Sequence, residues 1–116
     1  MLNFEVDTIK KEINNLLLAR SDSLRTLNLS RNKITTEYLE QLAEFLEANP
    51  TIVLDKIEMW HLKEAYLIDW NEFFGSFLRL KRPFTFVISG YQTEINKKQL
   101  QAFQKIEGNQ VSGVLV

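Results

Sequence analysis

Few side chains in this sequence could act as acids, bases, nucleophiles or metal ligands. His61 is the single histidine of the 116 residues, cysteine is absent, and no serine lies in the G-x-S-x-G context of an activated nucleophile. Glu58 precedes His61 by three residues, without the further ligand pair that a zinc site needs. We therefore predict no catalytic residue, no metal and no cofactor, and interpret His61 as a partly exposed turn residue. The alternatives for His61 are a partner contact, a pH-sensing group or an essential residue of an enzyme.

The charge and hydropathy of the chain argue against two classes of partner. The formal net charge is −1, so the chain lacks the broad positive field that neutralises nucleic-acid phosphates. The longest apolar runs, such as residues 16–19, are far too short to span a bilayer, and the first residues lack the features of a secretory signal. Without cysteine, no disulfide framework is expected. We expect a cytoplasmic protein that binds neither nucleic acid nor membrane.

Two adjoining stretches predict the elements that position the remaining side chains. Residues 24–34 begin with the pattern L-x-x-L-x-L, which places Leu27 and Leu29 on one face of a short strand. Asn32 follows, and its carboxamide can bond main-chain groups that a turn leaves unpaired. Residues 35–49 then have the apolar spacing of a helix with one buried stripe. The members of that stripe are Leu39, Leu42, Ala43 and Leu46.

This strand, asparagine turn and helix together resemble the leucine-rich repeat. The length of the unit is similar to that of the ribonuclease-inhibitor-like subfamily, in which each repeat has a full helix. Tyr38, where that pattern usually has a small residue, is an irregularity that also resembles small leucine-rich-repeat effectors of intracellular bacterial pathogens. The resemblance implies an α/β fold, a short right-handed solenoid with a parallel sheet on one side and helices on the other. An effector of that kind would be delivered into a host cytosol.

The pattern is expected to recur at a constant interval, which aligns a second unit with the first. Leu29 then corresponds to Ile57, and Leu39 corresponds to Leu67. By the same spacing, the aromatic residues of segment 66–77 are interpreted as core, with a membrane-surface helix as the alternative.

A cap, a third unit and a final strand complete the prediction. Asp7 is expected to cap a first helix, and after a slip of three residues Ile88 takes the place of Ile57 in the third strand. In the final strand, Val111 takes the place of Pro83. The chain is then one leucine-rich-repeat domain with an N-terminal cap at 1–23, repeats at 24–51, 52–82 and 83–110, and a final strand at 111–116.

The residues expected to face outward from the strands, with the turns after them, form the candidate binding site. Apolar side chains beside Trp60 and Tyr91 would give the apolar strip with a polar rim that is typical of a protein-binding hot spot. Shielding of these side chains by their neighbours is the alternative. The full set is Asn28, Ser30, Leu54, Lys56, Glu58, Trp60, His61, Thr85, Val87, Ser89 and Tyr91.

These features favour a protein-binding module over an enzyme. The expected partner is another protein, such as an enzyme or an effector, with Trp60 and Tyr91 as anchors and Lys56 and Glu58 setting the register. The resemblance implies that binding inhibits or regulates that partner. The alternative is an oligomerising scaffold, or a fragment of a longer repeat protein, that self-associates through the edge of the strand at 111–116.

Overall fold

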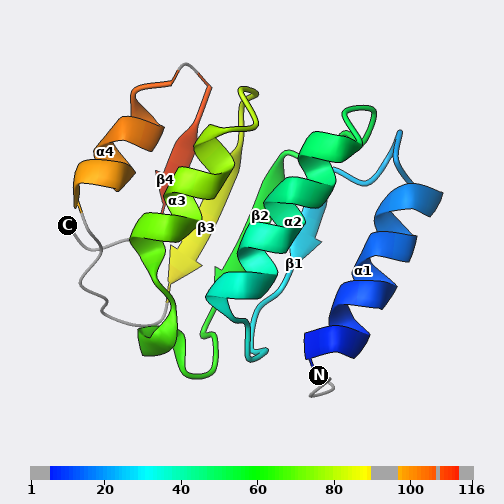
Figure 1. Cartoon of the computed structure of the whole chain (residues 1–116), viewed down its shortest axis with the longest axis horizontal. Coiled ribbons are helices and arrows are strands. Elements are labelled where there is room, and N and C mark those ends of the chain that lie inside the picture. The colour runs from blue at the N-terminus through cyan, green and yellow to red at the C-terminus, as the bar shows by residue number, and fades with distance from the viewer. Residues whose placement is uncertain (1–5, 90–96, 107, 113–116) are drawn as a thin grey trace.

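The computed structural model describes residues 6–89, 97–106 and 108–112, in which helices and strands alternate. The fold class is α/β, as the sequence predicts (Figure 1). In chain order the elements are α1 (Val6–Ala19), β1 (Thr26–Asn28), α2 (Thr36–Ala48), β2 (Lys56–Trp60), the 3₁₀ helix η1 (Ala65–Leu67), α3 (Trp70–Leu78), β3 (Thr85–Ser89), α4 (Lys97–Gln104) and β4 (Gln110–Ser112).

The strands form one sheet in the order β1-β2-β3-β4, and each neighbouring pair is parallel. Each crossover between neighbouring strands contains a helix, as parallel pairing requires. Figure 1 shows the described helices over one face of the sheet, which leaves the other face uncovered by them. The shortest dimension of the molecule, 19 Å, is the thickness of one such pair of layers. None of the helices in the described ranges has the length and apolar composition that crossing a bilayer needs.

The first two strands pair at a longer interval than the predicted one. Leu27 lies opposite Ile57. The predicted alignment would instead place Leu29 opposite Ile57, so it is wrong by two residues.

The predicted alignments of the later strands are wrong too. Ile88 lies opposite Met59 and not opposite Ile57. Val111 lies opposite Phe86 and not opposite Pro83. The interval between paired residues shortens from one strand pair to the next, so the units are unequal in length.

The first interval is explained by the cost of burying a charge. The predicted alignment would match Asp55 with the core residue Leu27, and an unpaired buried carboxylate is strongly unfavourable. In the structure Asp55 instead lies beside Arg25, with 3.1 Å between Oδ2 and Nη1, and both side chains are largely exposed. A shift of two residues keeps every side chain on its face of the sheet. Lys56 and Glu58 therefore face outward under both alignments.

The first turn and the second helix match their predictions. Asn32 is buried after β1, and its Nδ2 donates to the carbonyls of Leu29 and Ser30 at 3.2 Å each. Thr35 caps α2, since its hydroxyl accepts the N–H of Tyr38 at 3.1 Å. The predicted apolar stripe of α2 is fully buried. A strand, an asparagine turn and a capped helix thus follow one another as the sequence indicates.

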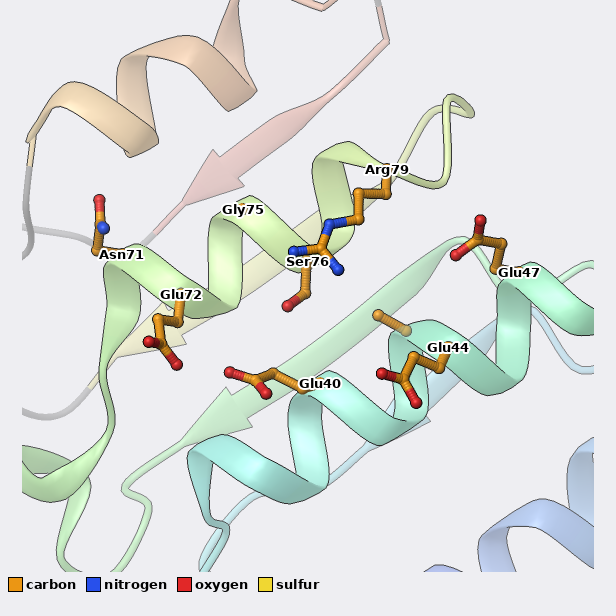
Figure 2. Close-up of a pocket in the computed structure, with 9 residues that line it drawn as sticks. Glu40, Glu44, Glu47, Asn71, Glu72, Gly75, Ser76 and Arg79 are labelled. Atoms are coloured by element: carbon orange, nitrogen blue, oxygen red, sulfur yellow. The ribbon is translucent and has the colours of Figure 1, made fainter.

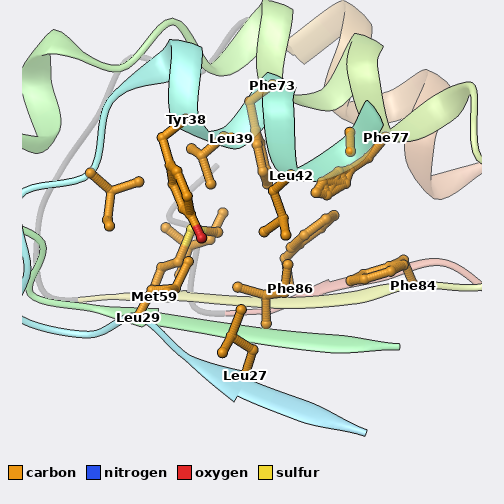
Figure 3. Packing of buried hydrophobic residues seen from close by; sticks show 14 of the residues in the cluster. Leu27, Leu29, Tyr38, Leu39, Leu42, Met59, Phe73, Phe77, Phe84 and Phe86 are labelled. Atoms are coloured by element: carbon orange, nitrogen blue, oxygen red, sulfur yellow. The ribbon is translucent and has the colours of Figure 1, made fainter. Parts of the chain in front are cut away.

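An aromatic core joins α3, β3 and α4. The ring centroids of Phe73 and Phe86 are 4.7 Å apart, and those of Phe77 and Phe84 are 5.2 Å apart. Phe103 of α4 lies 5.3 Å from Phe86. These rings are buried between the helix layer and the strands, where Figure 3 shows several of them. The prediction that the aromatic residues of α3 belong to the core is confirmed.

The two residues predicted to open this aromatic helix lie outside the core. Tyr66 and Leu67 belong to η1 and are 78% and 64% exposed, so their assignment to the core is wrong. The helix begins only at Trp70, because the Asp69 carboxylate accepts the N–H of Glu72 at 3.1 Å and caps it there. Everything between β2 and Asp69 is therefore loop, with η1 as a single turn.

The structure describes only part of the predicted cap and of the final strand. The first helix begins at Val6, so Asp7 lies in its first turn and does not cap it. Residues 1–5 of the cap lie outside the described residues. The final strand covers Gln110–Ser112, and residues 113–116 also lie outside the described residues.

Candidate binding surface

The outward side chains of the strands form two rows across the uncovered face. One row consists of Thr26, Lys56 and Thr85, and pairing places these residues directly opposite one another. The second row consists of Asn28, Glu58 and Val87. Within β2, Lys56 Nζ lies 3.7 Å from Glu58 Oε1. The predicted strand residues Asn28, Lys56, Glu58, Thr85 and Val87 are thus brought together on one surface, the strand face.

Two predicted residues are absent from this face because they lie just beyond the ends of strands. Leu54 is fully buried, because β2 begins only at Lys56. Ser30 is 5% exposed, and its Oγ accepts the N–H of Trp60 at 2.8 Å. The prediction that Leu54 and Ser30 point outward is therefore wrong. The backbone N–H of Ser30 donates to Asn28 Oδ1 at 2.9 Å.

Two other predicted residues cannot be placed fully. Ser89 ends β3 and lies opposite Trp60 in the register, but the structure does not describe its side chain. Tyr91 lies outside the described residues. The anchoring role predicted for Tyr91 therefore stays a prediction.

Trp60 lies where the strand face meets the loops at the carboxyl end of the sheet. Its side chain is 41% exposed, whereas its backbone is bonded on both sides to the first unit. The Trp60 N–H donates to Ser30 Oγ, and the Trp60 carbonyl accepts the N–H of Arg31 at 2.9 Å. An exposed indole is thus held on a fixed backbone.

Two loop residues beside Trp60 adopt a backbone conformation that L side chains disfavour. Arg31 has a φ of 66° and His61 has a φ of 50°, and each follows the end of its strand within a few residues. The left-handed region costs a side chain other than glycine or asparagine about 1 kcal/mol. Both side chains are exposed, as predicted for His61. Such strained positions are more frequent at functional sites than elsewhere in a protein.

The η1 loop carries exposed residues that sequence reasoning missed. The repeat spacing alone aligns Tyr66 and Leu67 with residues of the first unit's helix, and so predicts that both belong to a helix. The signal that could have placed them outside the helix is the pair Asp69 and Glu72, which has the spacing of a helix-capping motif. Leu67 also lines a groove of about 250 Å³ with Ile34 and the start of α2. Trp60, Tyr66 and Leu67 are thus exposed at the end of β2 and in the loop that follows it.

The helix layer has a second, acidic groove of about 370 Å³ between α2 and α3 (Figure 2). Glu40 and Glu44 line it from α2, and Glu72 and Arg79 line it from α3. A hydrogen bond that the protonated Glu40 carboxyl donates to Glu72 raises the pKa of Glu40, some burial and the nearby charges of Glu72 and Glu44 add to this, and Arg79 partly offsets it. Within residues 6–89, 97–106 and 108–112, no group of three His, Cys, Asp or Glu side chains is arranged to hold a metal ion.

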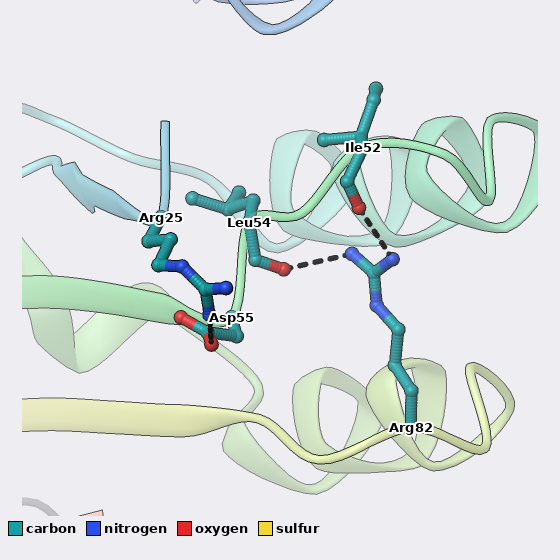
Figure 4. Close-up of polar contacts among 5 residues, drawn as sticks. All are labelled: Arg25, Ile52, Leu54, Asp55 and Arg82. Carbon is teal, nitrogen blue, oxygen red and sulfur yellow. Dashed lines mark hydrogen bonds and ion pairs between the residues drawn. The ribbon is translucent and has the colours of Figure 1, made fainter. Parts of the chain in front are cut away.

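The loops at the amino end of the sheet are held by polar contacts, of which those of Arg82 are partly buried (Figure 4). The guanidinium of Arg82 donates to the carbonyl of Ile52 at 2.7 Å and to that of Leu54 at 2.8 Å. Burial lowers the pKa of Arg82, and the nearby Asp55 carboxylate partly offsets this. These contacts join the loop before β2 to the loop before β3. We call Arg82 and the two carbonyls that it bonds the clamp at the amino end of the sheet.

The candidate site is therefore an exposed surface made of the strand face and the loops that follow β1 and β2. Its polar groups lie in rows, its aromatic groups lie at one rim, and its backbone is fixed by hydrogen bonds between units. No family model, curated protein or solved structure matches this chain.

Proposed function

We propose that the chain is a protein-recognition module of the leucine-rich-repeat type, a short right-handed solenoid that binds a partner protein on its strand face and adjoining loops. Consecutive parallel strands, each linked to the next through a helix, support the repeat architecture. The Asn32 turn supports the leucine-rich-repeat resemblance, because its carboxamide bonds two main-chain carbonyls. The helices cover one face of the sheet and leave the other open to a partner.

The observation that carries the proposal is the exposed indole of Trp60 on a backbone fixed at both its N–H and its carbonyl. Tryptophan contributes a large contact area with few rotatable bonds, so little conformational entropy is lost when a partner covers it. Aromatic anchors of this kind dominate the energy of many protein interfaces. Trp60 lies at the rim of the strand face and can act as such an anchor.

Lys56 and Glu58 set the register of the partner on the strand face. Their charged atoms are 3.7 Å apart and partly exposed, so a partner can pair with either charge without removing a buried one. Charges at the edge of an interface mainly increase the rate of association and exclude wrong orientations. The neighbouring outward residues Asn28, Thr85 and Val87 provide neutral contacts.

Binding is proposed to inhibit or regulate the partner, an enzyme or effector met in the cytoplasm. The strand face is the side of the sheet that the described helices leave uncovered, and an open surface acts by covering part of another protein. The regulatory role rests on the resemblance to ribonuclease-inhibitor-like proteins, which is an argument by analogy.

The test compares partner capture by the wild-type chain and by a variant with Trp60→Ala and Lys56→Ala. Proteins captured from lysate by the wild type and identified by mass spectrometry should be lost by this variant, while its melting temperature stays close to that of the wild type. Leu18→Ala is the matched control, because it removes an exposed apolar side chain from α1, away from the strand face.

Capture of the same proteins by the double variant would overturn the proposal, and so would loss of folding, which would mean that Trp60 belongs to the core. Light scattering of the isolated chain distinguishes the proposed monomeric module from the alternative, a self-associating scaffold. A molar mass that rises with concentration would favour that scaffold over a monomeric module.

A further inference from the structure

The acidic groove between α2 and α3 has charges that the protein itself does not balance. Four glutamates line it against one arginine, Arg79. None of these side chains makes an ion pair within the part of the chain that the structure describes. With the four glutamates ionised, four negative charges and one positive charge give the lining a net charge of −3. The glutamates are Glu40, Glu44, Glu47 and Glu72.

Two of these carboxyl groups come close enough to share a proton. When protonated, Glu40 of α2 donates a hydrogen bond to Glu72 of α3. Two carboxylates in such contact repel each other unless a proton or another cation lies between them. Arg79 offsets this repulsion only in part. A cation from solution that binds between the two helices would take the place of the proton.

A nearly buried hydroxyl group points into the same groove without a partner in the protein. Ser76 is 8% exposed, and Figure 2 shows its side chain directed from α3 into the space between the helices. Its Oγ makes no hydrogen bond to any of the residues that the structure describes. A hydroxyl in this position bonds water, or a ligand that displaces the water. Ser76 therefore marks a place where a ligand N–H group would donate.

Small residues keep the floor of the groove open. Ala43 of α2 and Gly75 of α3 line it beside Ser76. A Cβ added at Gly75 would meet no atom within 4 Å, so packing does not require glycine there, and glycine inside a helix is unfavourable. The groove has a volume of about 370 Å³, which is within the range of small-molecule sites, about 300 to 1,000 Å³.

The carboxylates are arranged for several positive charges in a row and not for one metal ion. Among the described residues, no three acidic side chains converge as metal ligands do. Glu40, Glu44 and Glu47 instead follow one another along α2, separated by about 6 Å and about 4.5 Å along the helix axis. An aliphatic amine with several ammonium groups on a flexible chain can pair with them in turn, and its N–H groups suit carboxylate and hydroxyl acceptors.

We infer that the groove between α2 and α3 binds an aliphatic polyamine, whose ammonium groups pair with the glutamates of both helices while one N–H group donates to Ser76 Oγ. The groove belongs to the helix layer, whereas the strand face is on the other side of the sheet. This site therefore adds a small-molecule ligand to the molecule and does not depend on the proposed function.

The test is isothermal titration calorimetry of the full chain with spermidine at low ionic strength. We expect saturable binding of one spermidine per chain. Gly75→Leu, which places a side chain in the groove and leaves the charge unchanged, should weaken binding by about tenfold or more. Ser76→Ala, which removes only the hydroxyl, should weaken it by about three- to tenfold. Neither change would alter a purely electrostatic attraction.

Matched charge changes separate the groove from the rest of the surface. Glu44→Gln should weaken binding by about threefold, because one exposed ion pair with the ligand is lost. Glu12→Gln makes the same change of charge on α1, away from the groove, and should leave the affinity unchanged. Arg79→Gln should strengthen binding, because it removes the opposing cation. Circular dichroism of each variant checks that the fold is retained.

Several outcomes would overturn the inference. These are the absence of saturable binding, equal affinity of the wild type and Gly75→Leu, or equal weakening by Glu44→Gln and Glu12→Gln. Binding of a lysine-rich peptide without binding of spermidine would also overturn it, and would assign the groove to a basic segment of another protein.

Discussion

The two ends of the sheet differ in where their aromatic residues lie. At the amino end, the half-buried Arg82 bonds two carbonyls, and Asn109 accepts the N–H of Phe84 at 2.8 Å and donates to the carbonyl of Phe103 at 3.1 Å. At the carboxyl end, Trp60 and Tyr66 are exposed. Buried side chains satisfy backbone groups at both ends, as Asn32 and Ser30 do at the carboxyl end, but among the described residues the exposed aromatic side chains lie at the carboxyl end.

This difference indicates which end of the sheet contributes more to stability and which end is free to contact other molecules. The amino end joins successive units through side chains that reach backbone carbonyls and amides, and any loss there leaves buried polar groups unpaired. The carboxyl end joins units through the buried Ser30 hydroxyl and through backbone bonds such as Arg31 N–H to the Trp60 carbonyl, whereas the Trp60 and Tyr66 side chains take no part in these bonds. Substitutions of these two exposed residues should therefore affect folding less than substitutions at the amino end.

The largest effect is expected from breaking the clamp at the amino end. Arg82→Ala leaves the carbonyls of Ile52 and Leu54 without their donor, and should lower the free energy of unfolding by about 3 kcal/mol. Urea denaturation measures this loss of stability. Arg25→Ala is the control, because it removes only an exposed ion pair with Asp55 and should cost less than about 1 kcal/mol. Equal losses for the two variants would show that burial does not distinguish these arginines.

A buried hydroxyl at the carboxyl end sharpens the comparison. Tyr38 extends from α2 toward the strand layer (Figure 3), is 1% exposed, and its hydroxyl has no hydrogen-bond partner among the described residues. Burial also raises its pKa. Tyr38→Phe should raise the free energy of unfolding by about 1 kcal/mol, because it removes an unsatisfied polar group and keeps the ring. A loss of stability in urea denaturation would imply a polar contact to that hydroxyl.

A smaller effect is expected at Arg31, where strain and exposure coincide. Arg31→Asn should raise the free energy of unfolding by less than about 1 kcal/mol, because asparagine tolerates a positive φ better than arginine. Thermal denaturation measures the change. Lower stability of this variant would show that the Arg31 side chain contributes more to the fold than its backbone strain costs.

The smallest effect concerns the acidic groove on the helix layer, which belongs to neither end. The raised pKa of Glu40 means that the folded state binds its proton more tightly than the unfolded state does. The stabilisation from this proton is present below the ordinary glutamate pKa and is lost as the pH rises through the raised value.

Glu40→Gln should therefore gain stability relative to the wild type as the pH rises from about 4 to about 7, by a few tenths of a kcal/mol, because the pair is largely exposed. Urea denaturation of both proteins across this range measures the difference. Glu47→Gln, on the same helix and lining the same groove, is the control. A difference that does not change with pH would contradict the shared proton.

The sequence predicts the local units better than their alignment. The Asn32 turn and the helix capped by Thr35 are specified by residues close together in the chain, so both were found. The interval between the first two strands was not found, because alignments that differ by two residues place the same side chains on the same face. The contact that separates them joins Arg25 to Asp55, which no local pattern reveals.

The candidate site was predictable where strand alternation applies and not beyond it. Lys56 and Glu58 lie inside a strand, so their outward direction followed from the pattern. Ser30 and Leu54 lie just outside strands, where errors of one or two residues in strand ends decide whether a side chain is buried. The exposure of Tyr66 depended on the position of the helix start, which the Asp69 cap determines.

The Asn28 side chain bears on how the protein resists aggregation. The N–H groups of Leu29 and Arg31 point toward β2, so the Ser30 N–H between them points away from the sheet, where Asn28 Oδ1 accepts it. A foreign strand that approaches the β1 edge would find this donor already occupied, which weakens intermolecular pairing there. The Asn28 carboxamide therefore opposes strand addition at this one position of the β1 edge.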